Sequence, residues 1–173
     1  TRNYLTEVNN TKGGPVGLNF NVTGQVRVLK VNNGSLFVGG SFTHFGGLAR
    51  PNLAVFNLIT NTVLPTRLLS CNGSINALQV SNDKIYFGGT FTTVNSVTRT
   101  RLAALDTASN LLSWSPTSGG AVEVIEYDQG RVFVGGTFNV INGLTNGSLA
   151  VLDTNTWAFH VVSPPVSGFV YGI

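Results

Sequence analysis

Two carboxylates, Glu123 and Glu126, have the types and spacing that come nearest to a catalytic pair in this chain. Two such groups on either side of a sugar linkage can hydrolyse a glycosidic bond. In two other copies of an internal repeat the same positions hold basic or amide side chains: Arg27 with Lys30, and Asn76 with Gln79. We therefore favour the interpretation that opposite charges pair between neighbouring copies, with the glycosidase pair as the alternative.

The other residues that could catalyse a reaction or bind a metal stand apart from one another. His44 and His160 do not occupy equivalent repeat positions, and His44 has no cysteine or acid nearby in sequence. A metal site needs several converging ligands. Cys71 is the only cysteine, so it forms no disulfide within this chain, and we expect a small buried apolar side chain. No nucleophile turn, phosphate loop or zinc motif is present. We expect no enzyme activity, metal or cofactor.

A candidate ligand face comes from residues that depart from the repeat or lie in its loops and length-variable stretches. Its members are His44, Arg50, Arg99, Arg101, Trp114 and Trp157. Arginine beside asparagine and aromatic groups could hold a glycan or an acidic peptide. The alternative, which we favour for Arg50 and Arg99, is that they tie one repeat unit to its neighbour. One polar position, by contrast, recurs in all three copies, as Asn57, Asp106 and Asp153. We expect each of these side chains to cap its own turn.

Composition indicates an all-β chain. Its 173 residues are 42% hydrophobic and only 10% charged, which argues against disorder. Valine, threonine and phenylalanine favour strands, while 21 glycines favour turns. The net charge of +3 is scattered, so we expect no nucleic-acid binding. No apolar run approaches a membrane span, no signal peptide is recognised, and the absence of methionine is typical of a mature or excised segment.

An internal repeat predicts the architecture. Gly39-Gly40, Gly88-Gly89 and Gly135-Gly136 each follow an apolar run and precede a phenylalanine, 49 and then 47 residues apart. A second motif, around Leu53, Leu102 and Leu149, recurs at the same spacings. Each copy contains four short strand patterns, in the first copy near 25–31, 36–42, 53–57 and 63–69, with a tight turn after the first. The fourth is expected near 111–115 and 156–162 in the later copies. Four antiparallel strands per repeat of about 48 residues is the blade of a β-propeller.

The predicted organisation is a single partial propeller over 1–173. It comprises a half blade at 1–22, blades near 23–71, 72–119 and 120–165, and the start of another at 166–173. We expect Phe42, Phe91 and Phe138 to be buried at equivalent places, and the paired glycines to be points of close packing.

The strand Phe133–Phe138, the pair Asn142-Gly143, the run Leu149–Asp153 and the run Ser113–Pro116 resemble bacterial secreted propeller repeats of the delta-sixty class. The Gly-Gly strand is also similar to the kelch-type strand, but the later tyrosine and tryptophan of that pattern are missing. Fungal cell-surface polarity markers carry similar repeats. The resemblance implies a secreted or surface-attached protein.

The function we expect is a non-enzymatic extracellular module for structure, adhesion or protein interaction. Two alternatives stay open. One is a propeller that binds or processes glycans. The other is an assembly subunit of a surface fibre or virus-like particle. Expected partners are other propeller segments of the same protein or another copy of the chain, with a glycan or surface protein as a further possibility.

Overall fold

A computed structural model describes residues 4–8, 10–11, 15–64, 70–81, 83–145, 147–156, 158–160, 162 and 165–173. These residues form strands and turns and contain no helix, hence none that could cross a membrane. The strands are β1 (Thr6–Val8), β2 (Pro15–Asn19), β3 (Gly24–Asn32), β4 (Ser35–Phe42), β5 (His44–Phe45), β6 (Leu48–Ala49), β7 (Leu53–Asn57), β8 (Thr62–Val63), β9 (Ile75–Val80), β10 (Lys84–Gly89), β11 (Thr93–Val94), β12 (Val97–Thr98), β13 (Leu102–Asp106), β14 (Val122–Asp128), β15 (Arg131–Gly136), β16 (Val140–Ile141), β17 (Leu144–Thr145), β18 (Leu149–Asp153) and β19 (Phe159–His160).

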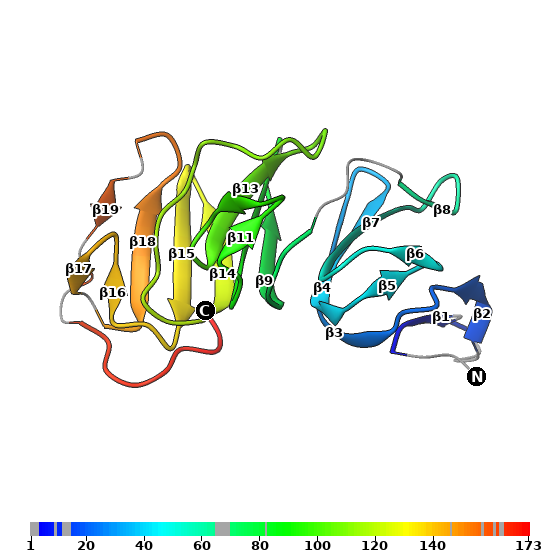
Figure 1. Cartoon of the computed structure of the whole chain (residues 1–173), viewed down its shortest axis with the longest axis horizontal. Helices are drawn as coiled ribbons and strands as arrows, with labels where there is room; N and C mark the ends of the chain where they lie inside the picture. The colour runs from blue at the N-terminus through cyan, green and yellow to red at the C-terminus, as the bar shows by residue number, and fades with distance from the viewer. Residues whose placement is uncertain are drawn as a thin grey trace.

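Three larger antiparallel sheets correspond to the repeats. Blade 1 has the order β3-β4-β7-β8, blade 2 has β9-β10-β13, and blade 3 has β14-β15-β18-β19. Figure 1 shows the three sheets side by side, with the small β1–β2 sheet at the end that holds the N-terminus and the last residues running back to β15. The all-β class and the propeller-type blades that the repeat predicts are therefore confirmed.

Each blade packs on the next through one glycine of its pair. A Cβ atom on Gly39 would lie 2.7 Å from Cγ2 of Ile75, which begins the first strand of blade 2. A Cβ on Gly88 would collide with Val122 of blade 3, and one on Gly135 would lie 2.5 Å from Cγ1 of Val170. The paired glycines thus leave room for a branched side chain of the following unit, as the repeat predicts.

The apolar core lies between successive sheets. Phe42, Phe91 and Phe138 are all buried, so the prediction for these three rings is confirmed. Phe91 belongs to the cluster between blades 1 and 2, Phe138 to the cluster between blades 2 and 3, and Phe42 to the cluster between the β1–β2 region and blade 1.

The outer strands and the loops differ from the prediction. The fourth strand is reduced to β8 in blade 1, to an isolated bridge between Leu105 and Leu111 in blade 2, and to β19 in blade 3. Part of the predicted ranges, 65–69 with 157 and 161, lies outside the described residues. The stretches between second and third strands, expected as loops, are hairpins: β5–β6, β11–β12 and β16–β17. Their turns have positive φ at Gly46, Asn95 and Asn142, the geometry that closes a two-residue hairpin.

Candidate functional site

His44 and Arg50 lie at the hairpin of blade 1. The His44 side chain is exposed, and its Nδ1 is 3.0 Å from the Thr43 hydroxyl. Arg50 is half-buried and donates through Nη1 to the carbonyl oxygen of Ala49 at 2.8 Å. Arg50 therefore holds its own hairpin, and this bond does not reach the neighbouring blade.

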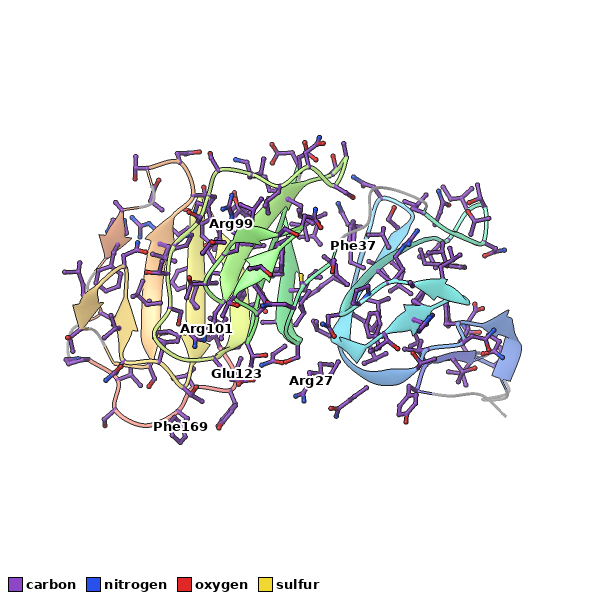
Figure 2. All side chains as sticks on the ribbon, viewed as in Figure 1. Arg27, Phe37, Arg99, Arg101, Glu123 and Phe169 are labelled. Carbon is purple, nitrogen blue, oxygen red and sulfur yellow. The ribbon has the colours of Figure 1, made fainter. Side chains whose placement is uncertain are left out.

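Arg99 and Arg101 also bond to carbonyl groups. Arg99 donates to Thr98 at 2.8 Å and to Leu112 at 2.9 Å, both in its own repeat. Arg101, at φ +67°, donates to Ser118 at 2.7 Å, in the segment that leads to blade 3. Figure 2 shows both arginines in blade 2. Both of these Arg99 bonds stay within blade 2, so they do not make the expected tie to a neighbouring blade, whereas Arg101 fastens the connection to the next blade.

Trp114 is 3% exposed, so its ring belongs to the core between blades 2 and 3. It meets Tyr86 edge to face, with the ring centroids 5.1 Å apart. Its indole N–H is buried and has no hydrogen-bond partner among the described residues. Trp157 lies outside the described residues. The structure thus spreads the candidate ligand face over two hairpins and a buried ring.

A polar row follows the first strands of the three blades. The pairing of the first and second strands shifts register around Arg27, Asn76 and Glu123, which marks a β-bulge in each blade. Asn76 donates to Glu123 at 3.0 Å, and Gln79 donates to Glu126. These bonds engage both carboxylates of the pair considered for glycoside chemistry. Figure 2 shows Arg27 and Glu123 along the same side of the molecule.

An ion pair along this row joins blades 1 and 3, which are not neighbours, so it differs from the charge pairing between neighbouring repeats that the sequence predicts. Lys30 of blade 1 lies 4.0 Å from a Glu126 oxygen of blade 3, and both side chains are partly exposed. An exposed pair of this kind contributes about 0–1 kcal/mol. The row borders a small cavity of about 170 Å³.

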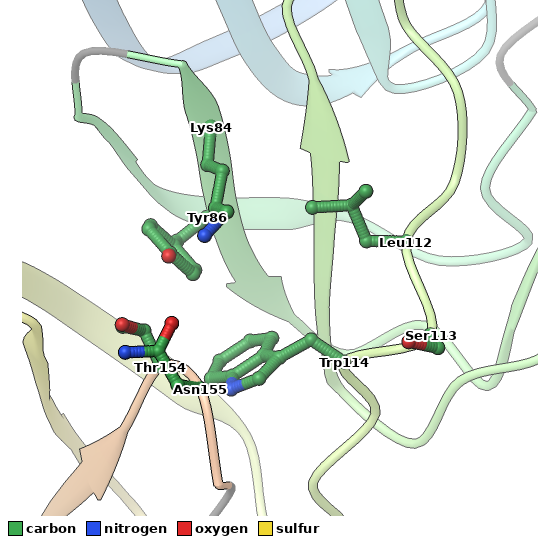
Figure 3. A pocket seen from close by; sticks show the side chains of 7 residues that line it. All are labelled: Lys84, Tyr86, Leu112, Ser113, Trp114, Thr154 and Asn155. Carbon is green, nitrogen blue, oxygen red and sulfur yellow. The ribbon is translucent and has the colours of Figure 1, made fainter.

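A pocket of about 250 Å³ opens at the junction of blades 2 and 3 (Figure 3). Tyr86 and Trp114 form its aromatic wall, and Lys84, Thr154 and Asn155 add polar groups. Thr154 donates its hydroxyl hydrogen to the Gly130 carbonyl at 2.9 Å. Burial raises the pKa of the Tyr86 phenol. Among the described members of the predicted ligand face, Trp114 alone lines this pocket.

A row of apolar side chains at the hairpin tips was missed at the sequence level. Leu48, Val97 and Leu144 occupy the same repeat position, and they are 45%, 45% and 54% exposed. Each hairpin joins the second strand to the third, so all three tips lie at the same edge of their blades. We refer to these three residues as the tip row. The signal was available in the sequence, because the position is apolar in every copy.

Two further groups have perturbed acidity. Burial raises the pKa of the Cys71 thiol to about 12, in line with its expected place in the core. Hydrogen bonds lower the pKa of Asp153, chiefly those from the backbone N–H groups of Thr156 and Asn155. Asn57 accepts equivalent bonds from Ile59 and Thr60, and Asp106 accepts one from Asn110. The prediction that this repeat position caps its own turn is confirmed.

The comparison with protein families agrees with the fold class. The family described as "Domain of unknown function (DUF5122) beta-propeller" matches residues 81–111, which supports a β-propeller repeat. The crystal structure of the computationally designed Ika8 protein is 16% identical, with a TM-score of 0.47, over 83% of this chain and 51% of that one. The chain thus spans about half the length of that structure. No curated protein matches the chain.

Proposed function

We propose that this propeller segment is a non-enzymatic module outside the cell that binds another protein through the tip row. The proposal rests on the exposure of Leu48, Val97 and Leu144, which occupy one repeat position. A single exposed leucine needs no explanation. An apolar residue kept exposed in three successive blades does, because packing within the blade does not account for it.

The hairpins present these side chains rigidly. The turn N–H of Asn95 donates to the Ser70 carbonyl at 2.9 Å, and its side-chain oxygen accepts from the Ser70 N–H at the same distance. Asn142 makes the same pair of bonds with Thr117, at 2.9 and 2.8 Å. Each tip is thereby fixed to the segment that leaves the preceding blade. A rigid surface loses less conformational entropy on binding than a mobile loop.

The location outside the cell is supported by the resemblance to bacterial secreted propeller repeats. Scarce charge and abundant threonine and asparagine fit the same setting. In this proposal the propeller supplies a scaffold, and the tips supply the contact.

A peptide-display selection tests the proposal. A library is selected against the chain, and the enriched peptides are then measured against a variant that carries Leu48→Ser, Val97→Ser and Leu144→Ser. We expect the variant to bind at least tenfold more weakly, because the three substitutions remove apolar surface that would be buried on binding.

Ile59→Ser is the matched control, since Ile59 is 80% exposed and lies outside the tip row. It should bind the selected peptides like the parent chain. Equal binding by the triple variant, or equal loss in the control, would contradict a role for the tip row. Circular dichroism of each variant confirms that the sheets are retained.

The pocket of Figure 3 favours a second candidate, glycan binding. Its aromatic wall of Tyr86 and Trp114 beside Lys84 and Asn155 offers an apolar surface together with hydrogen-bonding groups, a combination common in ligand sites. Titration of a panel of neutral and acidic monosaccharides, followed by tryptophan fluorescence, tests it. The same titrations of the Lys84→Gln variant serve as the reference. If no sugar gives a saturable change in fluorescence, glycan binding at this pocket is ruled out.

A further inference from the structure

One face of blade 1 is exposed where the other blades are covered. Leu29 and Val31 on β3 are 42% and 64% exposed. Their counterparts in blade 2 are Leu78 and Val80, and those in blade 3 are Ile125 and Tyr127. Leu78 and Ile125 are buried, and Val80 and Tyr127 are half-buried. The same sequence position thus has two environments in one chain.

The second strand of the preceding blade covers this position in blades 2 and 3. Gly39 lies against Ile75, and Phe37 belongs with Ile75 and Leu78 to the cluster between blades 1 and 2. Gly88 lies against both Val122 and Ile125.

The same strand of blade 2 also brings an aromatic ring to the interface. Tyr86 stacks on Tyr127, with the ring centroids 5.8 Å apart. The strand that covers the next blade therefore carries an aromatic residue and, two positions later, a glycine.

Only the outer part of the corresponding face of blade 1 is covered. Phe20 and Val22 pack there with Phe45 and Phe56, and Val26 lies at the border of that cluster. The sheet that precedes blade 1 consists of β1 and β2 among the described residues. The exposed Leu29 and Val31 continue from this existing interface toward the inner edge of the blade.

We propose that Val26, Leu29 and Val31 form a docking surface for a β-strand of the aromatic-x-Gly-Gly type, supplied by a further propeller repeat. Val26 would insert against the first glycine, as Ile75 does at Gly39. The aromatic ring would cover Leu29 and Val31, as Phe37 and Tyr86 cover their counterparts. This surface is distinct from the tip row, so either proposal can fail without the other.

The probe is a labelled peptide with the chain's own sequence Asp83–Phe91, which contains Tyr86, Gly88 and Gly89. Fluorescence anisotropy with the whole chain should show saturable binding. Leu29→Ser and Val31→Ser together should weaken it at least tenfold, and both side chains are exposed enough to change without loss of the fold. Ile59→Ser is the matched control and should bind like the parent.

A second peptide with valine in place of Gly88 tests the glycine requirement. It should bind at least tenfold more weakly, because its side chain would meet Val26. Equal binding of the two peptides, no saturable binding, or a double variant that binds like the parent would overturn the proposal. Light scattering of the chain alone provides one more test. If the chain forms a dimer that is absent in the Leu29→Ser, Val31→Ser variant, this surface belongs to a second copy of the chain instead.

Discussion

The hairpins β5–β6 and β11–β12 occupy equivalent places in blades 1 and 2, but different residues form their turns. In blade 1 the N–H of Gly46 donates to the Phe20 carbonyl at 2.6 Å. In blade 2 Asn95 makes the matching backbone bond to Ser70 and adds a side-chain bond to the same residue. Both residues supply the positive φ of the turn, but only asparagine also supplies an acceptor. The comparison shows that the turn needs a positive φ and one backbone hydrogen bond, and that the asparagine side chain adds a second hydrogen bond to them.

The largest effect should come from a feature that the blades share. Gly88→Val places a side chain against Val122 and Ile125 in the filled core between blades 2 and 3. We expect the free energy of unfolding to fall by about 3 kcal/mol or more, since overpacking a core is costly. Urea denaturation followed by tryptophan fluorescence measures it.

Gly17→Val is the control for this substitution, because the space around the Cβ position of Gly17 is open. Its effect should stay within about 0.5 kcal/mol. If the two substitutions cost the same, close packing is not the reason for the paired glycines.

A smaller effect should follow from making blade 2 resemble blade 1. Asn95→Gly keeps the turn but removes the side-chain bond to Ser70, and we expect a loss of about 1 kcal/mol. Asn95→Ala also forces a side chain without a polar group into the left-handed region, at an added cost of about 1 kcal/mol. Thermal unfolding should therefore rank the parent, the glycine variant and the alanine variant in that order. An alanine variant as stable as the glycine variant would show that the turn strain is absent.

The repeat allowed much of this fold to be predicted. The registers of the Gly-Gly and Leu-Ala motifs located the second and third strands, and β7 and β13 begin at the predicted leucines Leu53 and Leu102. The bulges at Arg27, Asn76 and Glu123 could not be predicted, because a bulge depends on the pairing between two strands. Without them, residues three apart such as Glu123 and Glu126 would point to opposite faces.

The candidate site was harder to predict than the fold. The sequence assigns Trp114 to the candidate ligand face because it lies in the fourth strand, whose length varies between repeats, yet its ring fills the core beside Tyr86. The arginines are held by carbonyl oxygens of segments up to 17 residues away, a contact that no local pattern reveals. The tip row, by contrast, is a repeated apolar position whose exposure only the hairpin geometry shows.

The smallest effect concerns the turn that Asn57 caps in blade 1 and Asp153 caps in blade 3. Both side chains accept bonds from two backbone N–H groups, but only Asp153 titrates. Its pKa lies below the ordinary value of 3.8. The stabilisation from its charged form is therefore complete above about pH 4 and is lost as the pH falls through the lowered pKa.

Asp153→Asn should leave stability at pH 7 nearly unchanged, since Asn57 shows that an amide can cap this turn, and it should flatten the decline on the acid side. Urea denaturation at a series of pH values from 2 to 7 measures both. Asp128→Asn removes the same charge from another turn of blade 3 and measures the general effect of net charge. If Asp153→Asn declines with acid as steeply as the parent, the turn bonds do not couple to the protonation of Asp153.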